Sequence, residues 1–350
     1  MSETVINFTM PVFNRLTATQ KALVALFRSD RTIPFSITVV DNGSEQALVD
    51  QLRKLHQDKI IDKLFLLPKN MGIACACNIG WEMTSAEFYC KIDNDTMPVR
   101  KDWISSLFRL WRNGKPLSTL GYAATKEQLL HNPGAMHTEE GILGVCTFNL
   151  AGTGIFIPKA VSDILGYWNE EYGLYGAEDG DYGLRMQCAG FPQYYYYGPD
   201  YIRYDLDTTG EAQYAARGVN KREEHALLSY DRRKKLGPIK LNQYLYHACI
   251  RNWKVKRRYY VKDIDDKCRV TIVEREEYKD TRIALWRCKR LIEKALIQGQ
   301  GDLLDNNSFI EQLKLVMDCC GQSINAFESA APSAKNMSAH EHHRPGVHPV

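Results

Sequence analysis

Short apolar runs alternate with longer amphipathic stretches along the first 205 residues of the chain. The short runs are rich in β-branched and aromatic residues and end at turn-forming residues, which is typical of buried strands. The longer stretches space apolar residues three and four positions apart, which is typical of helices with one buried face. We therefore predict strands at Val5–Thr9, Phe35–Val40, Lys63–Leu67, Phe88–Ile92 and Ile155–Ile157, and helices at Glu45–His56 and Ile73–Met83.

Two further helices have recognisable ends. Thr17, with Gln20 three residues later, matches a capping box and predicts a helix that begins there. Asp102 is a favourable N-cap for another helix, and Gly114 predicts its end.

Strands separated by helices of this length predict βαβ units and a mainly parallel sheet of the α/β class. In such sheets, ligands lie beyond the carboxyl ends of the strands. Polar clusters fall at three of these ends, at Pro11–Asn14, Asp41–Ser44 and Asp93–Asp95. Their common position predicts one binding site along this edge.

The chain changes character after Asp205, where it becomes more charged and less regular in its apolar spacing. Residues 231–262 contain eleven Lys or Arg and one acidic residue. Glu274–Gln298 has the pattern of a long amphipathic helix, whereas residues 330–350 contain few large apolar residues and are predicted to be disordered. We therefore expect a domain at 1–205, a mostly helical basic extension at 206–329 and a disordered tail at 330–350.

The amino-acid composition excludes few classes of function or partner. The net charge is +3 over 350 residues, so the overall charge identifies no class of partner. The 10 cysteines form no C-x-x-C pair, and the N-terminus lacks the pattern of a signal peptide. No run approaches the ~18 apolar residues of a membrane span. We expect a cytoplasmic protein, and its sequence leaves open a peripheral position on a membrane.

Asp93 and Asp95 flank one residue directly after the strand predicted at Phe88–Ile92. In an extended conformation both carboxylates point to the same side. Hard divalent cations prefer oxygen ligands and often bind through one or two carboxylates together with substrate phosphates. The same D-x-D pattern is also common in turns that simply end a strand.

The order of the surrounding motifs favours the metal interpretation. The chain resembles family 2 glycosyltransferases, which have a P-x-x-N-R start, a V-V-D-N-G-S turn, two N-x-G segments, a D-x-D after a strand and an E-D-x-D block that opens a helix. The matching segments here are Pro11–Arg15, Val39–Ser44, Asn70–Gly72 with Asn78–Gly80, Asp93–Asp95 and Glu178–Asp181. The resemblance covers about the first 205 residues and implies the GT-A fold, a Rossmann-like mixed sheet flanked by helices.

The resemblance also implies a nucleotide pocket. Asp41 would contact the uracil or ribose of the donor, and Pro11 and Asn14 would line the pocket. Asn70 and Gly72 would let the backbone approach the nucleotide closely.

A metal site is implied at the D-x-D motif, where Mn²⁺ or Mg²⁺ would act as a Lewis acid on the departing diphosphate. Asp95 would bind the metal directly, and Asp93 would contact the ribose or metal-bound water. Asp205 stands where many relatives have a histidine ligand, and a plain turn residue is an equally good interpretation. His225 is a weaker candidate.

The family pattern implies that Asp179, with Glu178 as second choice, takes the proton of the acceptor hydroxyl in an inverting transfer. These two acidic residues also have a purely structural explanation, because the helix dipole favours acidic residues in the first turn of any helix.

These observations predict a metal-dependent inverting glycosyltransferase that uses a nucleoside diphosphate sugar, with UDP-sugars first, and a glycan or glycolipid acceptor. The basic segment Arg232–Lys262 has three interpretations: a solvated surface, contact with an anionic membrane, or contact with nucleic acid in an enzyme that glycosylates modified DNA bases. The rival from another class is a non-catalytic nucleotide- or glycan-binding module, which the complete acidic set disfavours. A nucleotidyltransferase is also disfavoured, because Met10–Arg15 contains no glycine.

Overall fold

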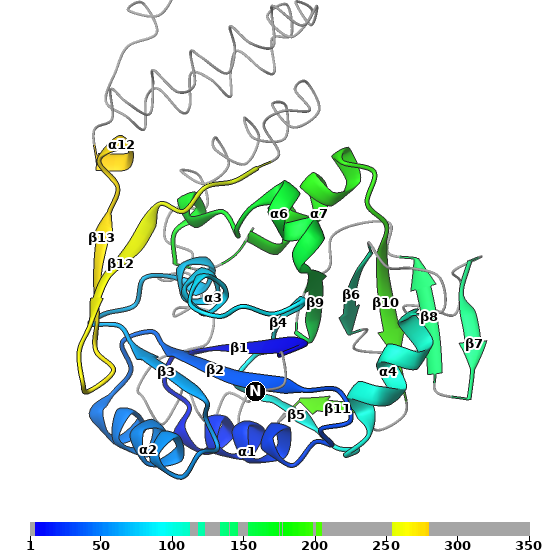
Figure 1. The fold of residues 1–350 in the computed structure, drawn as a ribbon, viewed down its shortest axis with the longest axis horizontal. Coiled ribbons are helices and arrows are strands. Elements are labelled where there is room, and N and C mark those ends of the chain that lie inside the picture. The colour runs from blue at the N-terminus through cyan, green and yellow to red at the C-terminus, as the bar shows by residue number, and fades with distance from the viewer. Residues whose placement is uncertain are drawn as a thin grey trace, which may run out of the picture.

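The computed structural model describes residues 4–112, 118–122, 134–139, 141–145, 153–174, 176, 178–198, 201–204 and 254–279. Its centre is a twisted mixed sheet with helices on both faces (Figure 1). The strands in the order of the sheet are β3 (Lys63–Leu66), β2 (Phe35–Asp41), β1 (Ile6–Val12), β4 (Phe88–Lys91), β9 (Ile155–Pro158), β6 (Thr119–Tyr122), β10 (Gln193–Tyr197), β8 (Gly141–Val145) and β7 (Met136–Thr138).

The half of the sheet that contains β3, β2, β1 and β4 is parallel. In the other half, β9 runs antiparallel to β4 and β6, and β10 pairs parallel with β6 and antiparallel with β8. The predicted mainly parallel sheet of the α/β class is thus confirmed. The remaining strands form two small ladders, one of β5 (Thr96–Pro98) with β11 (Ile202–Tyr204) and one of β12 (Tyr259–Ile264) with β13 (Val270–Glu274).

Helices α1 and α2 cover one face of the parallel half, and α3 lies on the opposite face (Figure 1). Among the described residues, no helix has the length and apolar character that crossing a lipid bilayer requires. The helices are α1 (Leu16–Phe27), α2 (Gln46–Gln57), α3 (Ile73–Glu82), α4 (Trp103–Arg112), α6 (Lys159–Leu165), α7 (Glu178–Cys188) and α12 (Glu276–Lys279), with a 3₁₀ turn at Glu170–Tyr172.

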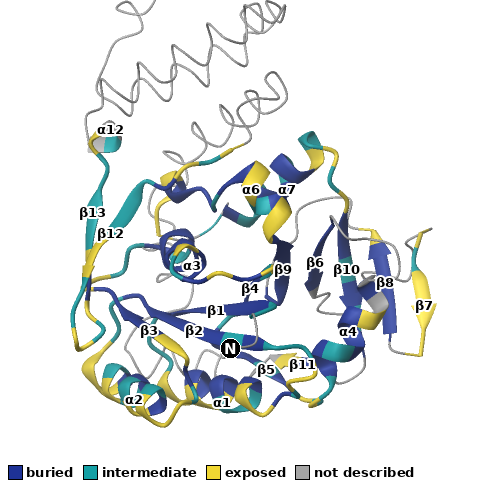
Figure 2. Ribbon diagram, viewed as in Figure 1, coloured by how far each residue is buried: buried dark blue, intermediate teal, exposed yellow. Residues whose placement is uncertain are grey.

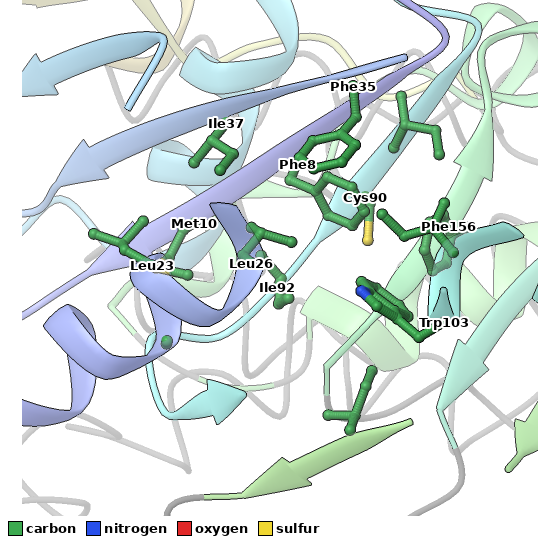
Figure 3. Close-up of a cluster of buried hydrophobic side chains, with 14 of the residues drawn as sticks. Phe8, Met10, Leu23, Leu26, Phe35, Ile37, Cys90, Ile92, Trp103 and Phe156 are labelled. Carbon is green, nitrogen blue, oxygen red and sulfur yellow. The ribbon is translucent and has the colours of Figure 1, made fainter. Parts of the chain in front are cut away.

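The main core lies between the sheet and the helices α1 and α4. Strand β1 points its alternate side chains Phe8 and Met10 into this core, where the ring of Phe8 meets those of Phe35 and Phe156 with centroids 5.3 and 5.8 Å apart (Figure 3). Trp103 of α4 packs into the same cluster (Figure 3). The central strands are buried on both faces, as continuous apolar runs predict (Figure 2).

Polar residues of β1 face α3 instead. The Asn7 side chain donates to the carbonyl of Gly80, and a Cβ on Gly80 would lie 2.4 Å from the Thr9 side chain. Helix α3 can therefore approach β1 this closely only because position 80 has no side chain. The second N-x-G segment of the sequence thus ends at a position that helix packing reserves for glycine.

The predicted start of α1 at Thr17 is wrong by one residue. The helix begins at Leu16, and Arg15 occupies the N-cap position without a side-chain cap. Asn14 and Arg15 both have left-handed backbone angles, with φ of 57° and 60°, so the chain turns sharply out of β1 and enters the helix before Thr17. The Thr19 hydroxyl donates to the Asn14 carbonyl and so ties the first turn of the helix to the preceding turn.

The described part of the predicted extension contains a β-hairpin. Residues 259–274, rich in β-branched side chains, pair as β12 and β13, and α12 begins only at Glu276. The predicted helix from Glu274 is therefore wrong for its first two residues, and its part beyond Lys279 lies outside the described residues. The boundaries at 205 and 329 remain predictions.

The hairpin packs against the sheet domain. Val270 joins a buried cluster with Val40 and Ile79, and the Leu66 amide donates to the carbonyl of Cys268. Basic residues take part in this docking. Arg257 is buried in ion pairs with Glu82 and Glu170.

Glu170 is the centre of this attachment. Its carboxylate accepts hydrogen bonds from the side chains of Asn78 and Arg257, both at 2.8 Å, and from the backbone amides of Arg258 and Tyr259 at 2.6 and 2.9 Å. Four donors around one buried carboxylate offset the cost of removing its charge from water.

Candidate active site

The D-x-D motif lies in the loop between β4 and β5. The Asp93 amide donates to the hydroxyl of Thr153 at 2.7 Å, and the hydroxyl of Thr96 donates to the same oxygen at 3.0 Å. Thr153 directly precedes β9, which neighbours β4 in the sheet. A single buried hydroxyl therefore fixes both ends of the loop that carries the two aspartates.

The middle residue of the motif is structural. Asn94 is 9% exposed, and its amide donates to the hydroxyl of Thr19 at 2.8 Å and to the Asn14 carbonyl at 3.2 Å. These bonds tie the D-x-D loop to the turn between β1 and α1. Two of the polar clusters predicted at the sheet edge are thus in direct contact.

Asp93 has a buried cationic partner. The ammonium group of Lys91 lies 3.0 Å from an Asp93 oxygen, and its side chain is 7% exposed. Burial alone would lower the pKa of Lys91, but the Asp93 carboxylate, with a contribution from Glu178, leaves that pKa above its ordinary value. Lys91 therefore stays charged beside the motif.

Asp95 pairs with a different cation. An Arg15 guanidinium nitrogen lies 2.5 Å from an Asp95 oxygen, and the two side chains are 23% and 12% exposed. Burial and the neighbouring Asp93 charge nevertheless hold the pKa of Asp95 above its ordinary value, although Arg15 lowers it. Asp93 and Asp95 thus each have one cationic partner, and burial is the largest cause of the raised pKa of Asp95.

Asp41 ends β2 at the same edge of the sheet. It is 1% exposed, and one carboxylate oxygen accepts the Ser44 amide at 3.2 Å. Its other oxygen has no hydrogen-bond partner among the described residues. Burial raises the pKa of Asp41, while its bonds to Ser44 lower it. A buried acceptor of this kind suits a ligand that brings its own N–H or O–H donor.

The predicted pocket residues Asn70 and Gly72 shape the neighbouring turn. The Asn70 side-chain oxygen accepts the Gly72 amide at 2.9 Å and the Asn42 side chain at 3.0 Å. Gly72 has φ of 91°, and a Cβ there would lie 2.4 Å from the carbonyl oxygen of Gly173. These contacts keep the turns after β2 and β3 together.

Asn14 and Pro11 also have definite structural places. The Asn14 side-chain oxygen accepts a hydrogen bond from the backbone amide of Glu45 at 3.1 Å. The backbone amide of Asn14 donates to the hydroxyl of Ser44. Pro11 is buried within β1 opposite Val40. Both residues therefore help to build the edge of the sheet at which the buried Asp41 lies.

The E-D-x-D block opens α7, as the sequence predicts. Glu178 is 8% exposed, and burial, with the adjacent Asp179 charge, raises its pKa to about 7 against the opposing effect of Lys91. Asp179 is only partly buried, and one of its oxygens accepts the Gly180 amide at 2.8 Å.

The last acid of the block is structural. Asp181 is bound by the Arg185 guanidinium at 2.8 Å and by the hydroxyl of Tyr172 at 2.5 Å, and both ionic side chains are essentially buried. Arg185 also donates to the carbonyl of Leu165. The i, i+4 pair thus fastens α7 to the end of α6 and aims the first turn of α7.

Lys91 connects the two acidic motifs, because it interacts electrostatically with both Asp93 and Glu178. Its contribution to the site was not predicted from the sequence, and neither were those of Arg15, Thr153 and Asp181. A lysine within the apolar run Phe88–Ile92 was the available signal, since a buried charge needs a partner.

Asp93 and Asp95 fit a metal that arrives with phosphate. Among the described residues, His, Cys, Asp and Glu side chains form no group of three or more that could hold a metal ion. Two carboxylates nevertheless suffice for Mg²⁺ or Mn²⁺ when phosphate oxygens and water complete the coordination. Asp205 and His225 lie outside the described residues.

Comparison with known proteins supports a glycosyltransferase. Residues 8–142, which include Asp41, Asp93 and Asp95, match the sequence model of glycosyl transferase family 2. The match ends before Glu178. No curated protein matches the sequence significantly.

Several solved structures are similar to the fold of this chain. TarS from S. aureus is 15% identical at a TM-score of 0.45, over 69% of this chain and 44% of TarS. A form of TarS spanning residues 1–349 in complex with UDP is 15% identical at the same TM-score, over 78% of this chain and 97% of that one. The mannosyltransferase PcManGT from Pyrobaculum calidifontis, in complex with GDP-Man and Mn²⁺, is 14% identical at a TM-score of 0.45. The similarity covers 70% of this chain and 64% of PcManGT. This chain thus spans less than half of the full TarS protein.

Proposed function

We propose that this protein is a metal-dependent, inverting glycosyltransferase that moves a sugar from a nucleoside diphosphate sugar to a hydroxyl of a glycan or glycolipid. The observation that carries the proposal is the convergence of two acidic motifs on Lys91. Asp93 comes from the loop after β4, Glu178 comes from the start of α7, and both interact with the same buried ammonium group. The family match supports the reaction class.

The donor nucleoside would bind at the end of β2. The buried, unpaired oxygen of Asp41 would accept a hydrogen bond from the base or ribose. Uracil offers an N–H for this purpose, so UDP-sugars are the first donors to test. The network of Asn14, Asn42 and Asn70 would hold the surrounding turns in place when the nucleotide enters.

Asp95 and Asp93 would hold Mn²⁺ or Mg²⁺, which supplies Lewis-acid neutralisation of the diphosphate charge. Lys91 would hold the Asp93 carboxylate in position through their ion pair. Asp205 remains a predicted additional ligand.

Asp179 is proposed as the general base. It is partly exposed, whereas Glu178 is buried, so Asp179 is the more accessible carboxylate to an acceptor hydroxyl. The acceptor oxygen forms a bond to the anomeric carbon, and the bond from that carbon to the diphosphate oxygen breaks with inversion. The acceptor proton passes to Asp179, and the nucleoside diphosphate leaves with the bonding electron pair. Glu178, with its pKa of about 7, is the second candidate for this role.

The test is release of nucleoside diphosphate from a panel of UDP- and GDP-sugars in Mn²⁺, with and without glycan acceptors. Asp179→Asn is compared with Glu178→Gln and with a control, Asp163→Asn, whose carboxylate lies on the exposed side of α6. We expect turnover by the wild type and the control, and a loss of about 10²–10⁴-fold in Asp179→Asn. Full activity in Asp179→Asn with loss in Glu178→Gln would transfer the role to Glu178. Absence of turnover with every donor would contradict the proposed function.

A further inference from the structure

Arg15 occupies an unusual place at the edge of the site. It follows β1 in a left-handed turn with Asn14, and its guanidinium reaches the loop after β4 to contact Asp95 at 2.5 Å. The turn itself is fastened, because the Asn14 amide donates to Ser44 and the Asn14 carbonyl accepts from Asn94. The backbone is therefore held, while the side chain of Arg15 extends from it.

The two aspartates of the motif differ in the cation that each has. Lys91 lies inside the domain with 7% of its side chain exposed, and the side chain of its partner Asp93 is 28% exposed. Arg15 is 23% exposed and approaches Asp95 from the rim. Lys91 is therefore fixed beside Asp93, whereas Arg15 has room to leave Asp95.

Asp95 is also the residue proposed to bind the metal directly. An arginine and a divalent cation that both require the same carboxylate compete for it, unless the carboxylate divides its two oxygens between them. The guanidinium group is a planar fork that matches phosphate oxygens as well as carboxylate oxygens. A diphosphate brought to the rim by the metal would offer Arg15 a new partner.

We propose that Arg15 is the counter-cation of Asp95 when no donor is bound, and that it exchanges Asp95 for the donor diphosphate when the metal binds. This inference rests on the proposed function. It assigns to Arg15 a diphosphate-binding role, and it makes metal and nucleotide binding interdependent. An ion pair that merely joins two loops would affect the two binding events equally or leave both unchanged.

The experiment measures Mn²⁺ binding to the full chain by the electron paramagnetic resonance signal of free Mn²⁺, first alone and then with UDP or GDP. Arg15→Met is compared with wild type and with Arg28→Met, an exposed arginine at the other end of α1. We expect Arg15→Met to bind Mn²⁺ alone about fivefold more tightly, because no partly exposed ion pair has to be broken. In the presence of Mn²⁺, we expect it to bind the nucleotide about tenfold more weakly, because a charge-assisted contact to the diphosphate is lost.

Effects in opposite directions support the exchange. Unchanged or weaker Mn²⁺ binding in Arg15→Met, while wild type binds Mn²⁺ with nucleotide, overturns this inference and leaves the proposed function intact. No Mn²⁺-dependent nucleotide binding by any variant overturns both. Should Arg15→Met fail to fold, Arg15→Gly suits the left-handed backbone and carries the same test.

Discussion

Two buried glutamates, Glu170 and Glu178, lie close in sequence and have opposite surroundings. Glu170 accepts four hydrogen bonds and pairs with Arg257. Glu178 is similarly buried, and burial, with the like charges of Asp179 and Asp93, raises its pKa to about 7 against the opposing charge of Lys91. The Glu170 carboxylate holds the hairpin on the domain, whereas the Glu178 carboxyl group, beside the candidate site, has a pKa near neutral pH.

In this fold, the groups that surround a buried acidic residue distinguish a structural role from a functional one. A buried carboxylate with enough donors is stabilising in its place, and removing it leaves unpaired partners. A buried carboxylate crowded by other carboxylates is costly to the fold and marks a candidate site. Asp181, bound by Arg185 and Tyr172, falls with Glu170 in the first group although it belongs to the E-D-x-D motif.

The largest expected effect concerns Glu170. Glu170→Ala leaves Arg257 buried beside Glu82 alone, and breaking a buried pair in this way costs about 3–5 kcal/mol. Urea unfolding of the full chain measures the change in the free energy of unfolding. The control Glu171→Ala removes the exposed neighbouring carboxylate and should stay within about 0.5 kcal/mol. Equal effects of the two variants would contradict the anchoring role.

The next effect is a pH dependence from Glu178. Because the folded-state pKa of about 7 exceeds the ordinary value of 4.5, the folded protein binds more protons than the unfolded chain between these values. This contribution to stability is complete below about pH 4.5 and is lost as pH rises through 7, by roughly 3 kcal/mol at 1.36 kcal/mol per pKa unit. Between pH 4.5 and 7, the free energy of unfolding should decline less in Glu178→Gln than in the wild type. An unchanged pH profile in that variant would contradict the assignment.

A smaller effect is expected in the polar framework below the site. Asn94→Ala removes two buried hydrogen bonds, to Thr19 and to the Asn14 carbonyl, and should cost about 2 kcal/mol. Asn94→Asp keeps the shape but loses both donors, so we expect it to be no better. Thermal unfolding followed by circular dichroism checks both variants. Wild-type stability in either variant would show that the two loops are not coupled through Asn94.

The smallest effect concerns an exposed pair on the hairpin. Arg258 and Glu274 are 30% and 26% exposed in their side chains, so their ion pair is screened by water. Glu274→Gln should therefore cost less than about 1 kcal/mol, and added salt should reduce even this difference. A loss as large as that of Glu170→Ala would overturn the distinction between enclosed and exposed pairs.

The sequence predicted the parallel half of the sheet well, because its strands are continuous apolar runs whose ends have turn residues. It predicted the start of α1 less well, since the left-handed turn at Asn14 and Arg15 overrides the local capping signal. The hairpin was not predicted, because its attachment depends on Glu170, a residue distant in sequence that accepts the backbone amides of Arg258 and Tyr259.

The sequence predicted Pro11–Asn14, Asp41–Ser44 and Asp93–Asp95 at the ends of strands along one edge, and the structure brings these turns into contact through Asn14. Their partners were not predictable. The contacts of Arg15 with Asp95 and of Thr153 with Asp93 join residues distant in sequence, so only the folded chain brings them together. Roles that the family pattern implies for the individual site residues remain predictions.

The central claim is that the loop after β4 binds a nucleoside diphosphate through a divalent metal. Isothermal titration calorimetry of UDP and GDP, with and without Mn²⁺, tests it most directly on wild type, Asp95→Ala and the exposed control Asp266→Ala. The account predicts metal-dependent binding of one nucleotide by wild type and control, and its loss in Asp95→Ala. Binding that is independent of Mn²⁺, or that Asp95→Ala retains at full strength, would contradict it.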